Sequence, residues 1–98
     1  MRREYSIITI QINGRKFNKI IIDPHVDKHA DHINDEIVIE LVYKLKNKVF
    51  IPTSLQHEFD YYAAIIKLND THYKLVWLTS RTEDFIGIIT AYRDRRIK

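Results

Sequence analysis

Apolar and polar residues alternate over both ends of the chain, and a helical repeat occupies its middle. Residues 4–12 and 15–22 are rich in β-branched side chains and are separated by Asn13-Gly14. Asn-Gly between two such segments favours a type I′ turn, because both turn positions need positive φ. The pattern therefore predicts an N-terminal β-hairpin. The two-residue loop also sets the expected cross-strand pairs, which are Ile10 with Phe17 and Ile8 with Lys19.

Two helices are predicted after the hairpin. Asp23-Pro24 is typical of a helix start, with Asp as the N-cap and Pro at the first helical position, and it predicts a short helix over residues 24–31. Asn34 is a second candidate N-cap, followed by two carboxylates that favour the helix dipole. Apolar residues then recur at helical spacing: Ile37, Val38, Leu41, Val42 and Leu45.

Three further strands are predicted near residues 59–68, 72–79 and 85–92, with residues 49–57 as a connection. Short polar loops separate the three strands, and loops of that length suit antiparallel hairpins. The predicted fold class is α+β: an N-terminal β-hairpin, two helices and three antiparallel strands. We expect one mostly antiparallel sheet with the helices on one side.

Length and composition narrow the function classes. A chain of 98 residues is expected to form a single domain, residues 1–98. The absence of cysteine excludes a disulfide framework and a thiolate nucleophile, and it indicates a reducing, cytoplasmic location. No apolar run approaches the ~20 residues of a membrane helix, so no membrane partner is expected. Two glycines are too few for a glycine-rich phosphate loop.

The net charge of +3 is concentrated at one chain end. Residues 93–98 hold four cations and one carboxylate, whereas residues 23–40 are acidic. A basic chain end is either an electrostatic footprint for phosphate or an ordinary solvated tail.

Candidate chemistry lies in two places. Thr90 and Tyr92 alternate onto one face of the last predicted strand, and a run of Arg93, Arg95 and Arg96 follows. A hydroxyl, a phenol and guanidinium groups together suit a phosphate site, because Arg can clamp phosphate with two hydrogen bonds.

His25, His29 and His32 follow each other at spacings of four and three residues near the first predicted helix. They are candidates for acid–base chemistry or for a transition metal, although exposed histidines among carboxylates are the commoner outcome of such a pattern. We expect no cofactor and no metal.

Aromatic residues form a third group. Trp77 with Tyr61, Tyr62 and Tyr73 would offer a platform for nucleic-acid bases if it were exposed. At strand spacing such residues more often belong to the core.

Three segments resemble the RelE/ParE-like toxin superfamily, and the BrnT-type toxins in particular, within the barnase–EndoU–colicin–RelE group of ribonuclease folds. They are Asp23-Pro24-His25, Tyr73-Lys74-Leu75-Val76-Trp77 and Ile88-Ile89-Thr90-Ala91-Tyr92-Arg93. The resemblance covers most of residues 15–96. It implies a toxin that cleaves mRNA without a metal and is neutralised by a cognate antitoxin.

Our first hypothesis is therefore such a ribonuclease. His25 or His29 is the candidate general acid or base, with Tyr92 and Arg93 as further catalytic candidates. Thr90, Arg95 and Arg96 are the candidates for holding substrate and phosphate.

The alternative hypothesis is a non-catalytic protein-interaction module, of immunity, antitoxin-like or regulatory type. Its acidic helix region would engage a basic partner and its hairpin would offer an edge strand. A histidine-dependent metal protein is a third hypothesis, so whether the chain is an enzyme stays open at this point.

Overall fold

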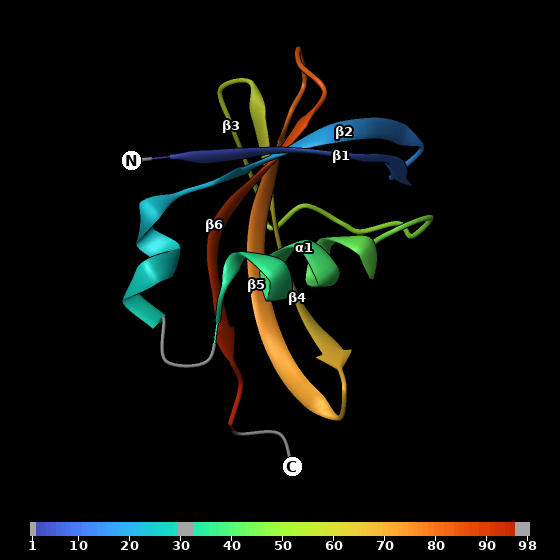
Figure 1. Ribbon diagram of the computed structural model, residues 1–98. Coiled ribbons are helices and arrows are strands. Elements are labelled where there is room, and N and C mark those ends of the chain that lie inside the picture. The colour runs from blue at the N-terminus through green and yellow to red at the C-terminus, as the bar shows by residue number, and fades with distance from the viewer. Residues whose placement is uncertain (1, 30–32, 96–98) are drawn as a thin grey trace.

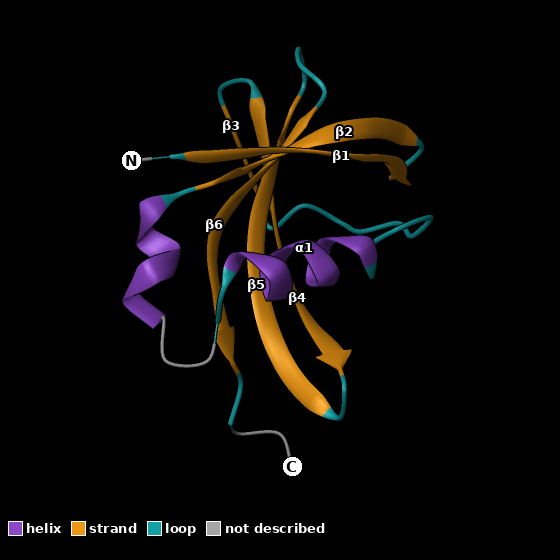
Figure 2. Cartoon of the chain, viewed as in Figure 1, coloured by secondary structure: helices purple, strands orange, loops and turns teal. Residues whose placement is uncertain are grey.

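A computed structural model describes residues 2–29 and 33–95 of the chain (Figure 1). The described residues form one six-stranded sheet in the order β1-β2-β6-β5-β4-β3. The strands are β1 (Arg3–Ile12), β2 (Arg15–Ile22), β3 (Ser54–Gln56), β4 (Phe59–Leu68), β5 (Thr71–Ser80) and β6 (Phe85–Arg93). Between β2 and β3 the described chain forms a 3-10 helix, η1 (Pro24–His29), and one α-helix, α1 (Asp35–Tyr43) (Figure 2).

The predicted fold class is wrong. The described chain is mostly sheet, with six strands and a single α-helix, where we expected two helices and, after them, three strands. The sheet is mixed, because β2 and β6 pair in parallel. The segment after Asp23-Pro24 makes a 3-10 helix whose first bond runs from the amide of Val26 to the carbonyl of Asp23, at 3.0 Å. β3 was missed because it has only three residues and follows Pro52 closely.

The predicted hairpin is present, but its register changes along the strands. Asn13 and Gly14 have φ of 52° and 76°, as a type I′ turn requires. Ile10 faces Phe17 as predicted, whereas Lys19 faces Ser6 and not Ile8. A bulge places residues 7–9 opposite Asn18 alone and leaves the side chain of Ile8 80% exposed. The other predicted strands are present as β4, β5 and β6.

The predicted helix after Asn34 is present as α1, although it ends at Tyr43 and leaves Leu45 of the predicted repeat in the turn that follows. The side chain of Asn34 accepts a hydrogen bond from the amide of Ile37 at 2.9 Å, which satisfies one of the free donors at the helix start. Val38, Leu41 and Val42 are fully buried on the inner side of the helix.

The core lies between α1 and one face of the sheet, and the β1–β2 hairpin crosses over it (Figure 1). Along β5 the side chains of Tyr73, Leu75 and Trp77 are buried on this inner face, while the residues between them are half-buried. Strand alternation sends those half-buried side chains to the opposite face. We call this second face, which points away from α1, the open face.

Arg3 ties both helices to β1. Its guanidinium makes two hydrogen bonds to Asp35, at 2.8 and 3.0 Å, and two to Asp27, at 2.9 and 3.0 Å. The hydroxyl of Tyr5 also donates to Asp35. Burial raises the pKa of Asp35, but the hydrogen bonds from Arg3 and Tyr5 outweigh it and hold that pKa below its ordinary value. The network fixes the starts of η1 and α1 against the sheet.

No helix in the described part of the chain is long and apolar enough to cross a membrane.

Candidate functional site

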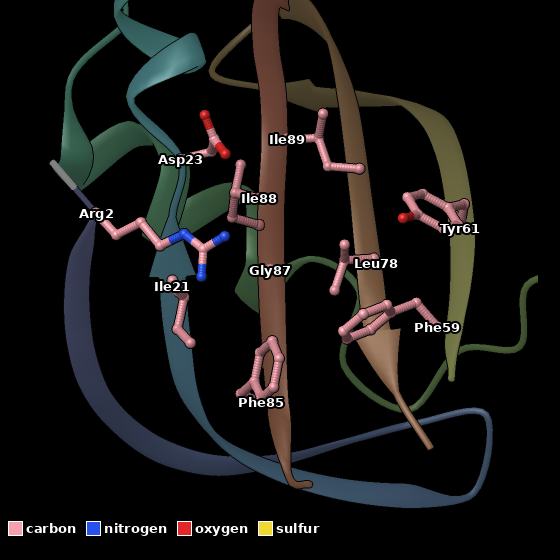
Figure 3. A pocket seen from close by; sticks show the side chains of 10 residues that line it. All are labelled: Arg2, Ile21, Asp23, Phe59, Tyr61, Leu78, Phe85, Gly87, Ile88 and Ile89. Carbon is pink, nitrogen blue, oxygen red and sulfur yellow. The ribbon is translucent and has the colours of Figure 1, made fainter. Parts of the chain in front are cut away.

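A groove of about 210 Å³ lies on the open face of the sheet (Figure 3). Its lining is mainly apolar and aromatic, and the rings of Phe59, Tyr61 and Phe85 belong to it. Phe59 and Phe85 meet edge to face, with their centroids 6.4 Å apart. Arg2 and Asp23 supply charges on the side of β2 (Figure 3). The site therefore combines apolar surface with a few polar groups, as ligand sites commonly do.

The groove is built on one row of residues across four strands. Ile21 pairs with Gly87, Gly87 with Leu78, and Leu78 with Tyr61, so the four positions share the open face. A Cβ atom added at Gly87 would lie 2.8 Å from Cδ1 of Leu78. A larger residue here would therefore require the side chain of Leu78 to shift, because that side chain occupies the space above β6.

Three basic residues belong to the open face. The guanidinium of Arg2 extends over the β2 side of the groove (Figure 3). Lys19 pairs with Phe85 and Lys74 pairs with Tyr92, so both lysines start from this face. Asp35 and Glu36, the carboxylates in the first turn of α1, belong to the inner side of the sheet, while Asp23 lines the groove and Glu4 pairs with Ile21 of the open face.

The structure brings the element that carries His25 beside the last strand. η1 packs against β6, and the amide of Asp23 donates to the carbonyl of Ile88 at 3.0 Å. The side chain of Asp23 accepts a hydrogen bond from the amide of His25 at 2.8 Å, which holds the start of η1 at this point. The parallel pairing of β2 with β6 runs to Ile22 and Ile88, so the chain enters η1 beside the second half of β6.

Thr90 and Tyr92 lie on the open face next to the groove. Thr90 pairs with Val76, and Tyr92 pairs with Lys74. The hydroxyl of Thr90 is buried and has no hydrogen-bond partner among the described residues. Such an unsatisfied buried hydroxyl is uncommon in folded proteins.

Arg93 does not share this face. It pairs with Tyr73, so its side chain starts from the inner face at the end of β6. Arg95 follows two residues later, after Asp94, whose amide donates to the carbonyl of His72 at 2.8 Å. The side chain of His29, together with His32 and Arg96, lies outside the described residues. Among the side chains that the structure describes, no group of three or more His, Asp or Glu is placed to hold a metal ion.

Most of the candidate aromatic platform is core. Trp77 is fully buried, stacks on Tyr62 at 5.2 Å and meets Phe50 edge-on at 5.1 Å. Tyr73 is also buried, and only Tyr61 of the four lies on the open face. Sequence reasoning missed Phe59, Phe85, Gly87 and Arg2. Period-two spacing carried a signal for one of these, because Phe59 and Tyr61 alternate onto one face of the predicted strand.

No known protein family, curated protein or solved structure was found to match this chain. The site is therefore interpreted from its own residues.

Proposed function

We propose that the open face binds single-stranded RNA and that the chain is a metal-independent ribonuclease of the toxin–antitoxin kind. One observation supports this most: half-buried rings of Phe59, Tyr61 and Phe85 line a groove that also holds Arg2 and Asp23. Lys19 and Lys74 start from the same face of the sheet. Single-stranded RNA is commonly bound by stacking its bases on aromatic rings while cations contact its phosphates. The acidic side chains of α1 lie on the other face, where they would not repel an RNA strand held in the groove.

In the proposed mechanism, a base takes the proton of a ribose 2′-hydroxyl and the 2′-oxygen forms a bond to phosphorus. The bond from phosphorus to the 5′-oxygen breaks, and an acid donates a proton to that leaving oxygen. His25 is assigned this acid–base chemistry, because η1 lies along β6. Thr90 and Tyr92 would position the ribose and the phosphate.

We assign to Lys74 the contact with the phosphate that the sequence led us to expect from Arg93. A cation at the scissile phosphate stabilises the negative charge that develops during cleavage. Lys74 pairs with Tyr92 and starts from the open face, whereas Arg93 starts from the inner face.

RNA binding is tested with two tyrosine variants that differ in their place in the fold. Tyr61→Ala removes a ring of the groove, while Tyr43→Ala removes an exposed ring from α1. Fluorescence anisotropy with a labelled single-stranded RNA should show an affinity loss of about tenfold for Tyr61→Ala, since stacking contributes about 1–3 kcal/mol per base. Tyr43→Ala should change the affinity less than about twofold. Equal losses in the two variants would refute the assignment of the groove.

Cleavage is tested in a buffer that contains a chelator, with the same RNA. His25→Ala should abolish cleavage and leave the melting temperature unchanged, because the side chain of His25 is exposed. His57→Asn is the matched control, since His57 lies in the turn before β4 and has a φ of 55° that asparagine adopts readily. Full cleavage by His25→Ala would exclude the catalytic assignment. RNA binding with no cleavage by the unaltered chain would favour the non-catalytic interaction module.

A further inference from the structure

The outer edge of β4 is mostly unpaired in the described chain. β3 is the last strand of the sheet, but its three residues pair only with Phe59–Tyr61. β4 continues to Leu68 and pairs with β5 along its whole length. Residues 62–68 therefore present backbone donors and acceptors at an outer edge, and such an edge is a template for another strand.

A hollow lies beside this edge on the inner side of the sheet. Its volume is about 310 Å³, and it lies between β4 and the chain that follows α1. Leu45, Phe50, Ala64 and Ile66 supply apolar lining. Lys44, Lys48 and Lys67 also line it, so the hollow combines apolar surface with three lysine side chains.

Large apolar side chains are exposed on the same elements. Val49 is 82% exposed and Ile51 is 88% exposed, and both flank Phe50 of the hollow. Ile65 on β4 is 42% exposed. Lysines alone would serve to protect an edge strand from aggregation. Exposed isoleucine and valine in the segments that line the hollow have the opposite effect, and they indicate a surface that another chain covers.

We infer that residues 62–68 of β4 are a docking site for an extended, acidic segment of a partner protein, which adds to the sheet as a further strand. Backbone hydrogen bonds to β4 would hold the segment, and alternate apolar side chains would fill the hollow. Carboxylates on the intervening side chains would face Lys67, whose position on β4 belongs to the open face. The long, exposed side chains of Lys44 and Lys48 would reach the segment's carboxylates from the rim of the hollow.

The positive charge of these lysines favours an acidic partner over a second copy of the chain. The one ion pair found for these lysines in the described structure joins Nζ of Lys67 to Asp70 at 3.8 Å, and the Asp70 side chain is 97% exposed. A pair so exposed contributes little and leaves Lys67 able to exchange partners. Two copies joined through β4 would bring their lysines together, and like charges at an interface oppose association.

A fluorescent peptide of alternating valine and glutamate, about seven residues long, is the probe for this edge. Titrated into the full chain without RNA, it should bind and shift backbone amide NMR signals of residues 62–68. Lys44→Glu with Lys67→Glu should weaken binding at least about tenfold, since both lysines line the hollow. Lys16→Glu with Lys19→Glu makes the same charge change on β2 and should weaken it less than about twofold.

A second peptide carries N-methyl groups on alternate backbone nitrogens and separates strand addition from plain charge attraction. Methylation on the pairing edge should abolish binding, because it removes donors and blocks close approach of the backbones. Equal binding of both peptides, NMR shifts confined to other strands, or no binding of the first peptide would overturn the inference. Dimerisation of the chain through β4 in sedimentation experiments would assign the edge to a second copy.

Discussion

Asn13 is predicted to stabilise the fold through its side chain as well as through its turn conformation. Its Nδ2 donates to the hydroxyl of Tyr62 at 3.0 Å, and its Oδ1 accepts from the amide of Phe50 at 2.6 Å. One asparagine therefore ties the β1–β2 turn to β4 and to the segment after α1. Asn13→Gly keeps the positive φ of 52° available and removes both hydrogen bonds.

The expected loss follows from the groups left without partners. The phenol of Tyr62, in a side chain only 4% exposed, and the half-buried amide of Phe50 each lose a hydrogen bond. A hydrogen bond contributes about 0.5–1.5 kcal/mol net, and leaving a buried partner unpaired costs about 1–3 kcal/mol. We expect Asn13→Gly to lower the free energy of unfolding by about 2–3 kcal/mol. For a domain of this size the melting temperature should fall by about 10–20 °C.

Asn69→Gly is the matched control. Asn69 begins the turn between β4 and β5 with a φ of 51°, its side chain is exposed, and no side-chain hydrogen bond is found for it among the described residues. Thermal unfolding followed by circular dichroism should show a change within about 0.5 kcal/mol for this variant. If both glycine variants melted at the same temperature, the side chain of Asn13 would have no stabilising role.

Four further substitutions test other parts of the structure by urea unfolding. Because the native pKa of Asp35 is lowered, its ionised form stabilises the fold above its unfolded pKa, and this contribution is lost as pH falls through the native pKa. Asp35→Asn should therefore destabilise the chain at pH 7 by about 1–2 kcal/mol and by less near pH 3, and an equal deficit at both would contradict this. Gly87→Ala should cost about 1 kcal/mol by displacing Leu78 and should also weaken RNA binding; wild-type values for both would be the contrary result. Ile8→Lys should change stability within about 0.5 kcal/mol, whereas Ile10→Lys should prevent folding, and the reverse order would refute the bulge.

Local signals in the sequence predicted most individual elements. Asn13-Gly14 identified the first hairpin because a type I′ turn depends on those two residues alone. Asn34 identified the start of α1 for a similar reason, since an N-cap acts on an amide three residues away. Neither signal involves residues distant in the chain.

The errors came from contacts that join distant segments. The parallel pairing of Ile20 with Ile86 links positions far apart in the sequence, and no local pattern specifies it. The predicted pairing of Ile8 with Lys19 holds only for a regular antiparallel ladder, and the bulge in β1 pairs Lys19 with Ser6 instead. The groove was missed for the same reason, because Phe59, Phe85 and Arg2 come from three separate segments and meet only through the strand order.

Net charge also proved a poor guide to the candidate site, because several arginines have structural contacts. Arg3 holds both helices, and Arg15 donates to the carbonyl of Ser80 at 2.6 Å while its guanidinium lies over the ring of Phe17. Arg81 donates to Asp60 at 2.7 and 3.0 Å. A guanidinium already paired in this way would have to give up those hydrogen bonds to contact a phosphate.

The cations of the open face differ from these arginines. No ion pair is found for Arg2, Lys19 or Lys74 with any other residue that the structure describes. Each phosphate contact by such a cation releases counterions and adds to the salt dependence of RNA binding. Replacing Lys74 with Gln should therefore reduce the salt dependence of RNA affinity and preserve stability, while replacing Arg81 with Gln should lower stability and preserve the salt dependence. Lys74 and Arg81 each carry one positive charge, but we expect Lys74 to act on RNA binding and Arg81 to act on stability.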